Sequence, residues 1–421
     1  MKSPIPRALF LVVLMTTVAC GKQKTEQAGA PLAITHVTVI DATGNPPVRN
    51  MTVVIRDGHI AAIDSTIEVP TPATVIDGTG KFLIPGLWDM HGHFTDATEA
   101  AFPLLIENGV TGVRDMGGEL AKVDGWRKEI ADGTRIGPHI VRCGPILDGP
   151  TESKHHFVIN NPAEAVHAVD SLKQLGVDFI KVHRNMSRET FFALVEEAHK
   201  IGIPVAVHLP STVTVQEASQ AGAKSLEHIE MLVASAAYQV GPSAKRVVDV
   251  LPVITGAAGD SIFATFVKNG TYYVPTLVAY ERGFVLWGSD TTKVAGRARV
   301  QGHHLRLVKA MHRAGVQIMA GSDFSDWALV AGVDLHNELA LFVEAGFTPM
   351  EAIQAATIKP AMFLGMQDSL GTIEVGKIAD LVLLDADPLE DISHTRKIRA
   401  VVVGGRMVPV MELRARFTDP Q

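Results

Sequence analysis

Short runs rich in valine, isoleucine and threonine lie near both ends of the chain, and Asn-Pro and Asp-Gly turn signals separate those of the N-terminal part. Such runs are typical of β-strands. We predict N-terminal strands at residues 34–40, 52–56, 59–63 and 74–76, and C-terminal strands at residues 381–385, 398–403 and 407–411. Because the two ends share this texture, the pattern predicts one small β-sandwich domain built from residues 32–84 and 371–421.

Between these ends, residues 85–370 alternate apolar runs of strand length with amphipathic stretches of helical length. The predicted strands are residues 87–94, 112–116, 139–143, 179–183, 205–209, 225–229, 273–277 and 317–323. The predicted helices include residues 162–175, 187–201 and 293–314. Strand and helix alternating in this way predict an α/β fold of the (β/α)₈ TIM barrel type. An open doubly wound sheet is the main alternative, but its glycine-rich phosphate loop is absent from the sequence.

The first residues have the pattern of an export signal. Lys2 and Arg7 precede an apolar stretch, residues 8–19, that is too short to span a bilayer and ends at Cys20. Residues 17–20 resemble a bacterial lipoprotein box, so we expect residues 1–20 to be a signal peptide and Cys20 to carry a lipid. Residues 21–31 would then be a polar tether. The alternative is an ordinary signal peptide with Cys20 incidental. Either way we expect an exported bacterial protein, and the lipid would anchor it in the periplasm or at the cell surface.

Composition narrows the class of protein. The chain has 421 residues, 47% of them hydrophobic, which is ample for a large core. Its net charge is -7, and no basic cluster with interleaved aromatic residues suggests nucleic-acid binding. Besides Cys20 there is only Cys143, which lies in an apolar run, so we expect a buried, inert thiol and no internal disulfide.

Polar residues at the ends of the predicted strands carry the candidate chemistry. His91 and His93 are two residues apart, so they point to the same face of their strand, as does Asp89, which could brace them. Later strand ends supply Lys181, His208, His228 and Asp323. Each residue alone has an ordinary structural explanation, such as a helix cap for an aspartate. Together they would meet at one mouth of the barrel, which predicts a nitrogen/oxygen site of the kind that Zn²⁺ favours.

Lys181 needs a separate explanation, because an ammonium group would be repelled by a cation at this site. Burial and nearby cations lower the pKa of a lysine, so a neutral amine is expected. A neutral amine can add CO₂ to give a carbamate, an anionic ligand able to bridge two metal ions. The alternatives are a lysine that reaches to the barrel rim or a neutral amine bonded to a neighbour.

The ordered set His91-Gly-His93, Lys181, His208, His228 and Asp323 resembles that of the amidohydrolase superfamily. Residues 85–91 and 371–382 are similar to those of its imidazolonepropionase-like and Xaa-Pro dipeptidase branch. The resemblance implies two divalent ions, most simply Zn²⁺, bridged by carbamylated Lys181 and a hydroxide. The more buried ion would be held by His91, His93 and Asp323, and the more exposed ion by His208 and His228.

The resemblance also implies the activity. We expect a metal-dependent amidohydrolase that cleaves an amide C–N bond of a small molecule, in dipeptides or N-acyl amino acids, with Asp323 passing a proton from the hydroxide to the leaving nitrogen. A deaminase is disfavoured because such enzymes usually lack the lysine ligand. A lactone, ester or phosphotriester hydrolase and a non-catalytic metal-binding surface lipoprotein remain as alternatives. Members of this superfamily are often homo-oligomers, so the resemblance leaves a homo-oligomer of this chain open.

Candidate substrate contacts lie around the same mouth. Related dipeptidases present a substrate-contacting histidine after the third strand, where this chain has His155 and His156. His183 shares the face of Lys181 one step nearer the mouth, where a solvated rim histidine is an equal alternative. Arg184 and Tyr273 could receive a substrate carboxylate, although surface roles are the simpler reading of both.

Overall fold

A computed structural model describes residues 30–97, 99–153, 156–240, 247–286, 291–325, 329–408 and 410. The predicted signal peptide, with Cys20 and nearly all of the tether, lies outside these residues. Among the described residues, no helix is both long and apolar enough to cross a membrane.

Both ends of the chain form one eight-stranded sheet with the order β18-β17-β16-β5-β1-β2-β3, and β4 also pairs with β1. Its strands are β1 (Leu32–Val39), β2 (Val48–Arg56), β3 (His59–Asp64), β4 (Thr74–Asp77), β5 (Phe82–Pro85), β16 (Leu381–Leu384), β17 (Ile398–Val403) and β18 (Arg406–Val408). Antiparallel pairing of β5 with β16 joins the two halves. Both chain ends thus contribute strands to one sheet, close to the predicted positions, while the domain bounds and the two layers of a sandwich stay predictions.

The remaining strands form a three-stranded sheet, β6-β7-β8, and a seven-stranded sheet, β10-β9-β11-β12-β13-β14-β15. Neighbouring strands within each of these sheets are parallel. They are β6 (Leu87–Gly92), β7 (Val110–Asp115), β8 (His139–Arg142), β9 (Ile146–Asp148), β10 (His156–Val158), β11 (Ile180–Val182), β12 (Val205–Val207), β13 (Ser225–Glu227), β14 (Tyr272–Val274) and β15 (Gln317–Ile318). Each strand predicted between residues 85 and 370 is present, and β9 and β10 were not predicted.

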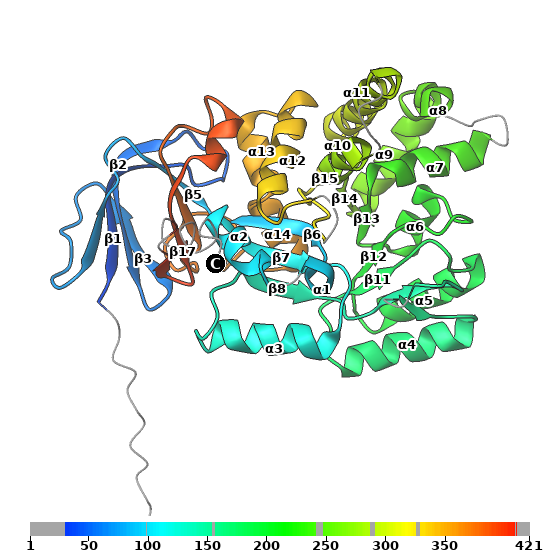
Figure 1. Cartoon of the computed structure of the whole chain (residues 1–421), viewed down its shortest axis with the longest axis horizontal. Helices are drawn as coiled ribbons and strands as arrows, with labels where there is room; N and C mark the ends of the chain where they lie inside the picture. Colours follow the sequence, from blue (N-terminus) through cyan, green and yellow to red (C-terminus); the bar gives the residue numbers. More distant parts are fainter. Residues whose placement is uncertain are drawn as a thin grey trace, which may run out of the picture.

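Helices alternate with these strands and lie beside them (Figure 1). They are α1 (Phe94–Ala97), α2 (Ala101–Glu107), α3 (Leu120–Ala131), α4 (Pro162–Gln174), α5 (Arg188–Lys200), α6 (Val215–Ala221), α7 (Ile229–Val240), α8 (Val247–Ile254), α9 (Ala257–Asn269), α10 (Leu277–Leu286), α11 (Thr291–Arg313), α12 (Val333–Glu344), α13 (Pro349–Ala355), α14 (Ile358–Leu364) and the 3₁₀ helix η1 (Ile392–Arg396). In Figure 1 the sheet built from both chain ends lies to the left, and the parallel strands with their helices lie to the right.

Local sequence explains where the predicted helices begin. Asn161 caps α4 by accepting a hydrogen bond from Glu164 N, and Pro162 occupies the first helical position. Ser187 caps α5 in the same way through Thr190 N. The predicted starts of both helices are therefore confirmed.

Backbone hydrogen bonds join the first and last parallel strands. Asp323 N donates to His91 O at 2.7 Å, and His93 N donates to Phe324 O at 2.9 Å. Gly92 allows this close approach, because a Cβ atom there would lie 2.1 Å from Cε1 of Phe324. On the other side, Asp178 N donates to Arg142 O at 2.9 Å, which links β8 to the segment leading into β11. The three-stranded sheet is thus linked on both of its edges to segments of the seven-stranded sheet, and strand ends distant in sequence come together.

The free thiol of Cys143 is fully buried, and burial raises its pKa. The predicted buried cysteine is confirmed, and its inertness stays a prediction that the raised pKa favours, since such a thiol forms little thiolate.

The core of the sheet built from both chain ends allows a test of how strongly the packing between the two halves stabilises the fold. Leu83 in β5 is fully buried among apolar side chains of both halves, including Leu383. We expect Leu83→Ala to lower the free energy of unfolding by about 3 kcal/mol, because it removes buried methyl groups and leaves a cavity. The measurement is urea denaturation of the mature protein, with Val75→Ala as control, since Val75 is 54% exposed. A loss below about 1 kcal/mol for Leu83→Ala would contradict this account of the core.

Candidate active site

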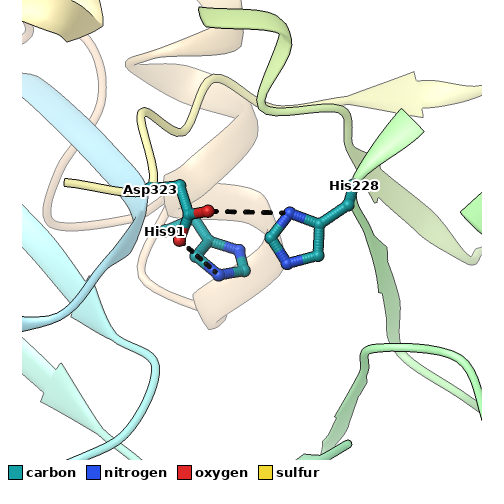
Figure 2. A group of neighbouring side chains, drawn as sticks. All are labelled: His91, His228 and Asp323. Atoms are coloured by element: carbon teal, nitrogen blue, oxygen red, sulfur yellow. Dashed lines mark ion pairs between the residues drawn. The ribbon is translucent and has the colours of Figure 1, made fainter. Parts of the chain in front are cut away.

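The ends of three parallel strands bring together His91, His228 and Asp323 (Figure 2). Asp323 Oδ1 lies 3.4 Å from His91 Nε2, and Asp323 Oδ2 lies 3.9 Å from His228 Nδ1. His93 joins the same group, with its Nε2 3.3 Å from Asp323 Oδ1. The structure therefore gathers these predicted ligands around one carboxylate.

His208 extends this group in a row of imidazole rings. Its ring centroid lies 4.8 Å from that of His228, which in turn lies 4.5 Å from that of His91. The Nε2 atoms of His91 and His208 are buried and have no hydrogen-bond partner. Buried polar atoms are normally paired, so these two nitrogens are suited to donate to a ligand that binds between the strand ends.

The protonation state of these rings also suits a metal ion. Burial lowers the pKa of His91, His208 and His228 well below the ordinary value for histidine, and neighbouring cationic groups lower it further. The imidazoles are therefore neutral at pH 7 and keep a nitrogen lone pair, which is the form that coordinates metals.

Lys181 lies in the middle of β11 and is only 2% exposed. Burial lowers the pKa of its amine to about 8, although the carboxylates of Glu227 and Asp323 act in the opposite direction. A larger share of this amine is unprotonated at pH 7 than in an ordinary lysine. The pKa is lowered in the direction expected from the sequence, but at about 8 it leaves most of the amine protonated at pH 7, so the neutral amine and its carbamate stay predictions.

A buried ion pair holds His91 in place, and sequence reasoning missed both of its members. Glu227 Oε2 accepts from His91 Nδ1 at 2.8 Å, and Glu227 also accepts from Arg114 Nη2 at 2.8 and 2.9 Å. Arg114 donates from Nε to Met90 O at 2.7 Å, and all three side chains are fully buried. Because a carboxylate only accepts, the proton of His91 lies on Nδ1 and Nε2 is left free. A charged residue inside an apolar strand was the available signal, as it was for Lys181.

Asp89 ties the strand of His91 to the segment that carries Asp323. It accepts from His91 N at 3.2 Å, from Ser322 N at 2.9 Å and from the Ser322 hydroxyl. Burial raises the pKa of Asp89 to about 7. Asp89 therefore fixes the backbone of His91 and of Ser322, the residue before Asp323.

The backbone of the site is strained at three residues. His228, Thr276 and Asp323 have φ angles of 66°, 46° and 60°, in the left-handed region that non-glycine residues seldom adopt. Such a conformation costs about 1–3 kcal/mol each, and it clusters at functional sites. Thr276 also places its Oγ1 2.9 Å from His228 Nδ1, which occupies that nitrogen and leaves Nε2 for other contacts.

A second polar cluster lies beside His208 and centres on Asp148, which sequence reasoning missed. Asp148 Oδ2 accepts from His156 Nδ1 at 2.9 Å and from His183 Nδ1 at 3.1 Å, and Oδ1 accepts from Asn185 N at 2.7 Å. These contacts hold the pKa of Asp148 below its usual range. The ring of His183 lies 4.2 Å from that of His208, so two predicted substrate contacts are held at the edge of the candidate metal centre.

The other predicted substrate contacts are placed differently. His155 lies outside the described residues, and Arg184 is exposed. Tyr273 is fully buried, and its hydroxyl donates to His228 O at 2.9 Å. That bond uses the phenolic proton that a contact with a substrate carboxylate would need.

One more carboxyl group lies near this centre. Glu230, in the first turn of α7, has an Oε2 atom that is buried and has no hydrogen-bond partner. Burial and the charge of Asp323 raise its pKa to about 8. No predicted role accounts for this group.

Two sets of described residues could hold a metal ion: His91, His228 and Asp323, and the cluster of Asp148, His156 and His183. The first set fits a divalent cation better, because the Nε2 atom of His91 has no hydrogen-bond partner, whereas the Nδ1 atoms of the second set are already paired with Asp148. Nitrogen and carboxylate donors of this kind are those that Zn²⁺ prefers.

The sequence matches the model of the amidohydrolase family over residues 82–408. The chain belongs to the amidohydrolase family. It is 27% identical over 442 residues to ochratoxinase of Aspergillus niger, which covers 88% of this chain and 85% of that enzyme. It is 23% identical over 367 residues to imidazolonepropionase of Symbiobacterium thermophilum, covering 78% of this chain and 82% of that protein. The solved structure of a candidate prolidase from Bifidobacterium longum has a TM-score of 0.74 and 28% identity, covering 92% of this chain and 98% of that one.

Membership explains the arrangement of the strands. Amidohydrolases have a TIM-barrel-like α/β fold, act on small molecules and generally use divalent metal ions, so the predicted family, the general fold class and a hydrolase activity are confirmed. In this amidohydrolase the candidate metal centre lies at the C-terminal ends of the parallel strands, where TIM-barrel active sites lie.

From the ion pair between Arg114 and Glu227, which holds His91, we predict an effect on metal binding. We expect Glu227→Gln to weaken binding of Zn²⁺ by about 10- to 100-fold, because the neutral amide holds His91 less firmly and leaves the Arg114 charge unbalanced. The measurement is competition with a chromophoric chelator, with the exposed Glu196→Gln as matched control. Equal affinity of Glu227→Gln and wild type would show that Glu227 does not support the site.

Proposed function

We propose that this protein is a metal-dependent hydrolase that cleaves the amide C–N bond of dipeptides or N-acyl amino acids. The observation that carries the proposal is the convergence of His91, His93, His228 and Asp323 beside the unpaired Nε2 atoms of His91 and His208. Ochratoxinase, imidazolonepropionase and an Xaa-Pro dipeptidase among the similar proteins are consistent with this class of reaction.

The proposal includes two divalent ions, with Zn²⁺ the metal that the donor set favours. His91, His93 and Asp323 would hold one ion, His208 and His228 the other, and Lys181 as its carbamate would link them. When bound, the ions would lower the pKa of a water molecule and polarise the scissile carbonyl group. The low pKa of Lys181 supports the carbamate, because only an unprotonated amine adds CO₂.

The chain's own residues would then move the proton. The Asp323 carboxylate is held by its backbone bond to His91 and is 26% exposed, so it can reach both the centre and a substrate. In the proposal it accepts the proton of the attacking water and passes it to the leaving nitrogen, since an amine must leave protonated. Glu227 and Thr276 keep the imidazoles of His91 and His228 oriented while this happens.

The proposal also covers the fold around the site and the location of the protein in the cell. The parallel strands would close into an eight-stranded barrel over residues 85–370, and the sheet of residues 32–84 and 371–421 would fold as a β-sandwich. The protein would be exported and anchored in the bacterial periplasm or at the cell surface by a lipid on Cys20, and a homo-oligomer is compatible with the family. Labelling of Cys20 with a fatty acid, together with build-up of the labelled, uncleaved precursor in the presence of globomycin, tests the anchor, and unlabelled export would contradict it.

The activity is tested by assay of the mature protein with and without metal. We expect protein treated with a chelator to lose amide hydrolysis and Zn²⁺ to restore it, because without the metal nothing lowers the pKa of the attacking water and polarises the scissile carbonyl group. The measurement is a panel of dipeptides and N-acyl amino acids, together with metal analysis. Cleavage of lactones or phosphotriesters without cleavage of any amide would contradict the proposal and favour a lactone or phosphotriester hydrolase. Bound metal without any hydrolysis would favour a metal-binding protein.

Asp323 gives a sharper test of the mechanism. We expect Asp323→Asn to retain at least one metal ion but to lower kcat by about 10²- to 10⁴-fold, because the amide cannot take up the proton. The measurement is steady-state kinetics beside metal analysis of the same sample. A kcat close to wild type in a metal-loaded variant would rule out the role of Asp323 in proton transfer.

A further inference from the structure

A second cluster of side chains, Asp148, His156 and His183, lies beside the candidate metal centre and has no part in the proposed mechanism. One donor atom from each of these side chains lies within 4.8 Å of the other two. The ordinary explanation is a carboxylate that orients two imidazoles by hydrogen bonds. Two imidazoles and one carboxylate are also a ligand set of the kind that Zn²⁺ prefers. The contacts within the cluster decide between these explanations.

More donors converge on Asp148 than its carboxylate needs. The backbone N–H groups of Gly149 and Asn185 donate to Oδ1 at 2.9 and 2.7 Å. Oδ2 faces three nitrogen atoms: Nδ1 of His156 at 2.9 Å, Nδ1 of His183 at 3.1 Å and Nδ2 of Asn185 at 3.1 Å. A carboxylate oxygen has about two lone pairs, so one of these three donors is in excess. A cation between Oδ2 and the two imidazole nitrogens would relieve this crowding.

The distances within the cluster are close to those between the ligands of one metal ion. Ligand atoms about 2.1 Å from a Zn²⁺ ion lie about 3.0–3.4 Å apart, for angles between those of an octahedron and of a tetrahedron. The Oδ2–Nδ1 distances of 2.9 and 3.1 Å are near this range, so small movements of the side chains would complete the set.

The carboxylate of Asp148 is charged, as a cation site requires. Burial alone would raise the pKa of Asp148, but the hydrogen bonds from His156 and His183 outweigh burial and hold this pKa below its usual range. The negative charge therefore does not have to be created when an ion arrives.

An ion can also reach the two imidazoles from solvent. The side chains of His156 and His183 are 12% and 16% exposed, whereas that of Asp148 is fully buried. Coordination through Nδ1 requires the proton of each neutral ring to move to Nε2. Among the described residues no hydrogen bond occupies Nε2 of either ring, so this exchange keeps both protons and breaks no further contact.

We propose that Asp148, His156 and His183 form a binding site for one Zn²⁺ ion, additional to the ions of the proposed mechanism. Binding there is weaker than at the centre around Asp323, because the ion has to replace two hydrogen bonds. The rings of His183 and His208 are only 4.2 Å apart, so an ion held by His208 would also repel it. The site therefore fills only when Zn²⁺ is in excess.

The test counts the ions that the mature protein takes up as free Zn²⁺ is raised. The readout is the number of ions per chain after equilibrium dialysis in a series of chelator-buffered Zn²⁺ solutions. The variants are His156→Gln and Asp148→Asn, with the exposed His167→Gln as matched control. Thermal unfolding without metal checks that each variant folds, and the partly exposed His156 keeps the test available if Asp148→Asn does not.

We expect the wild type and His167→Gln to bind one ion more than His156→Gln and Asp148→Asn. Loss of a group that merely orients a ligand lowers metal affinity by about 10- to 100-fold, and loss of a direct ligand costs at least as much. The difference of one ion does not depend on how many ions the centre around Asp323 holds. It can therefore be read even if the proposed function fails, and a failure here leaves the proposed function untouched.

Two outcomes would overturn the additional site. One is an equal number of ions in the wild type and His156→Gln at every concentration of Zn²⁺, which would leave Asp148 with the role of orienting two imidazoles. The other is an extra ion that the wild type and all three variants bind equally, which would be an adventitious ion only.

Discussion

The buried carboxylate of Glu227 is the interaction on which the candidate site depends. It accepts from His91 on one side and from Arg114 on the other, and none of the three side chains is exposed. A buried ion pair of this kind adds little net stability, because desolvation offsets most of the attraction. Its consequence is orientation: the pair places the proton of His91 on Nδ1 and directs Nε2 toward Asp323.

The backbone around the site also adopts unfavourable conformations. Left-handed conformations at His228, Thr276 and Asp323 turn their side chains inward just beyond the strand ends. Neutral imidazoles buried against one another and against Lys181 add a further cost, because their unpaired nitrogens have lost water. The surrounding parallel strands and helices must supply the stability that holds this arrangement, and a bound cation would relieve part of the cost by pairing with those nitrogens.

Much of the fold and several site residues could be predicted from the sequence, because they depend on local periodicity. Alternation of apolar runs with helical stretches located every parallel strand expected between residues 85 and 370, and the polar residue after each run marked His208, His228 and Asp323. Several strand ends were predicted too long, and after β13 and β14 the left-handed residues His228 and Thr276 end the strand earlier than the side-chain pattern does. Glu227, Arg114 and Asp148 were missed because their roles depend on partners that are distant in sequence. In each case the sequence shows a charged residue within an apolar run, but the periodicity does not indicate which residue pairs with it.

The charges at the mouth also limit which substrates fit the site. Asp148 pairs with both His156 and His183, so that side of the mouth presents imidazoles whose orientation is already fixed. On the other side Glu230 has no partner for its Oε2 atom, and Tyr273 has used its hydroxyl on the backbone of His228. Burial raises the pKa of Glu230 to about 8, so this carboxyl group is mostly protonated at pH 7 and adds little charge to the mouth. Asp323 is by contrast 26% exposed, so a ligand that enters the mouth meets its carboxylate. A cation, whether a metal ion or a positive group of a substrate, is therefore favoured there over an anion.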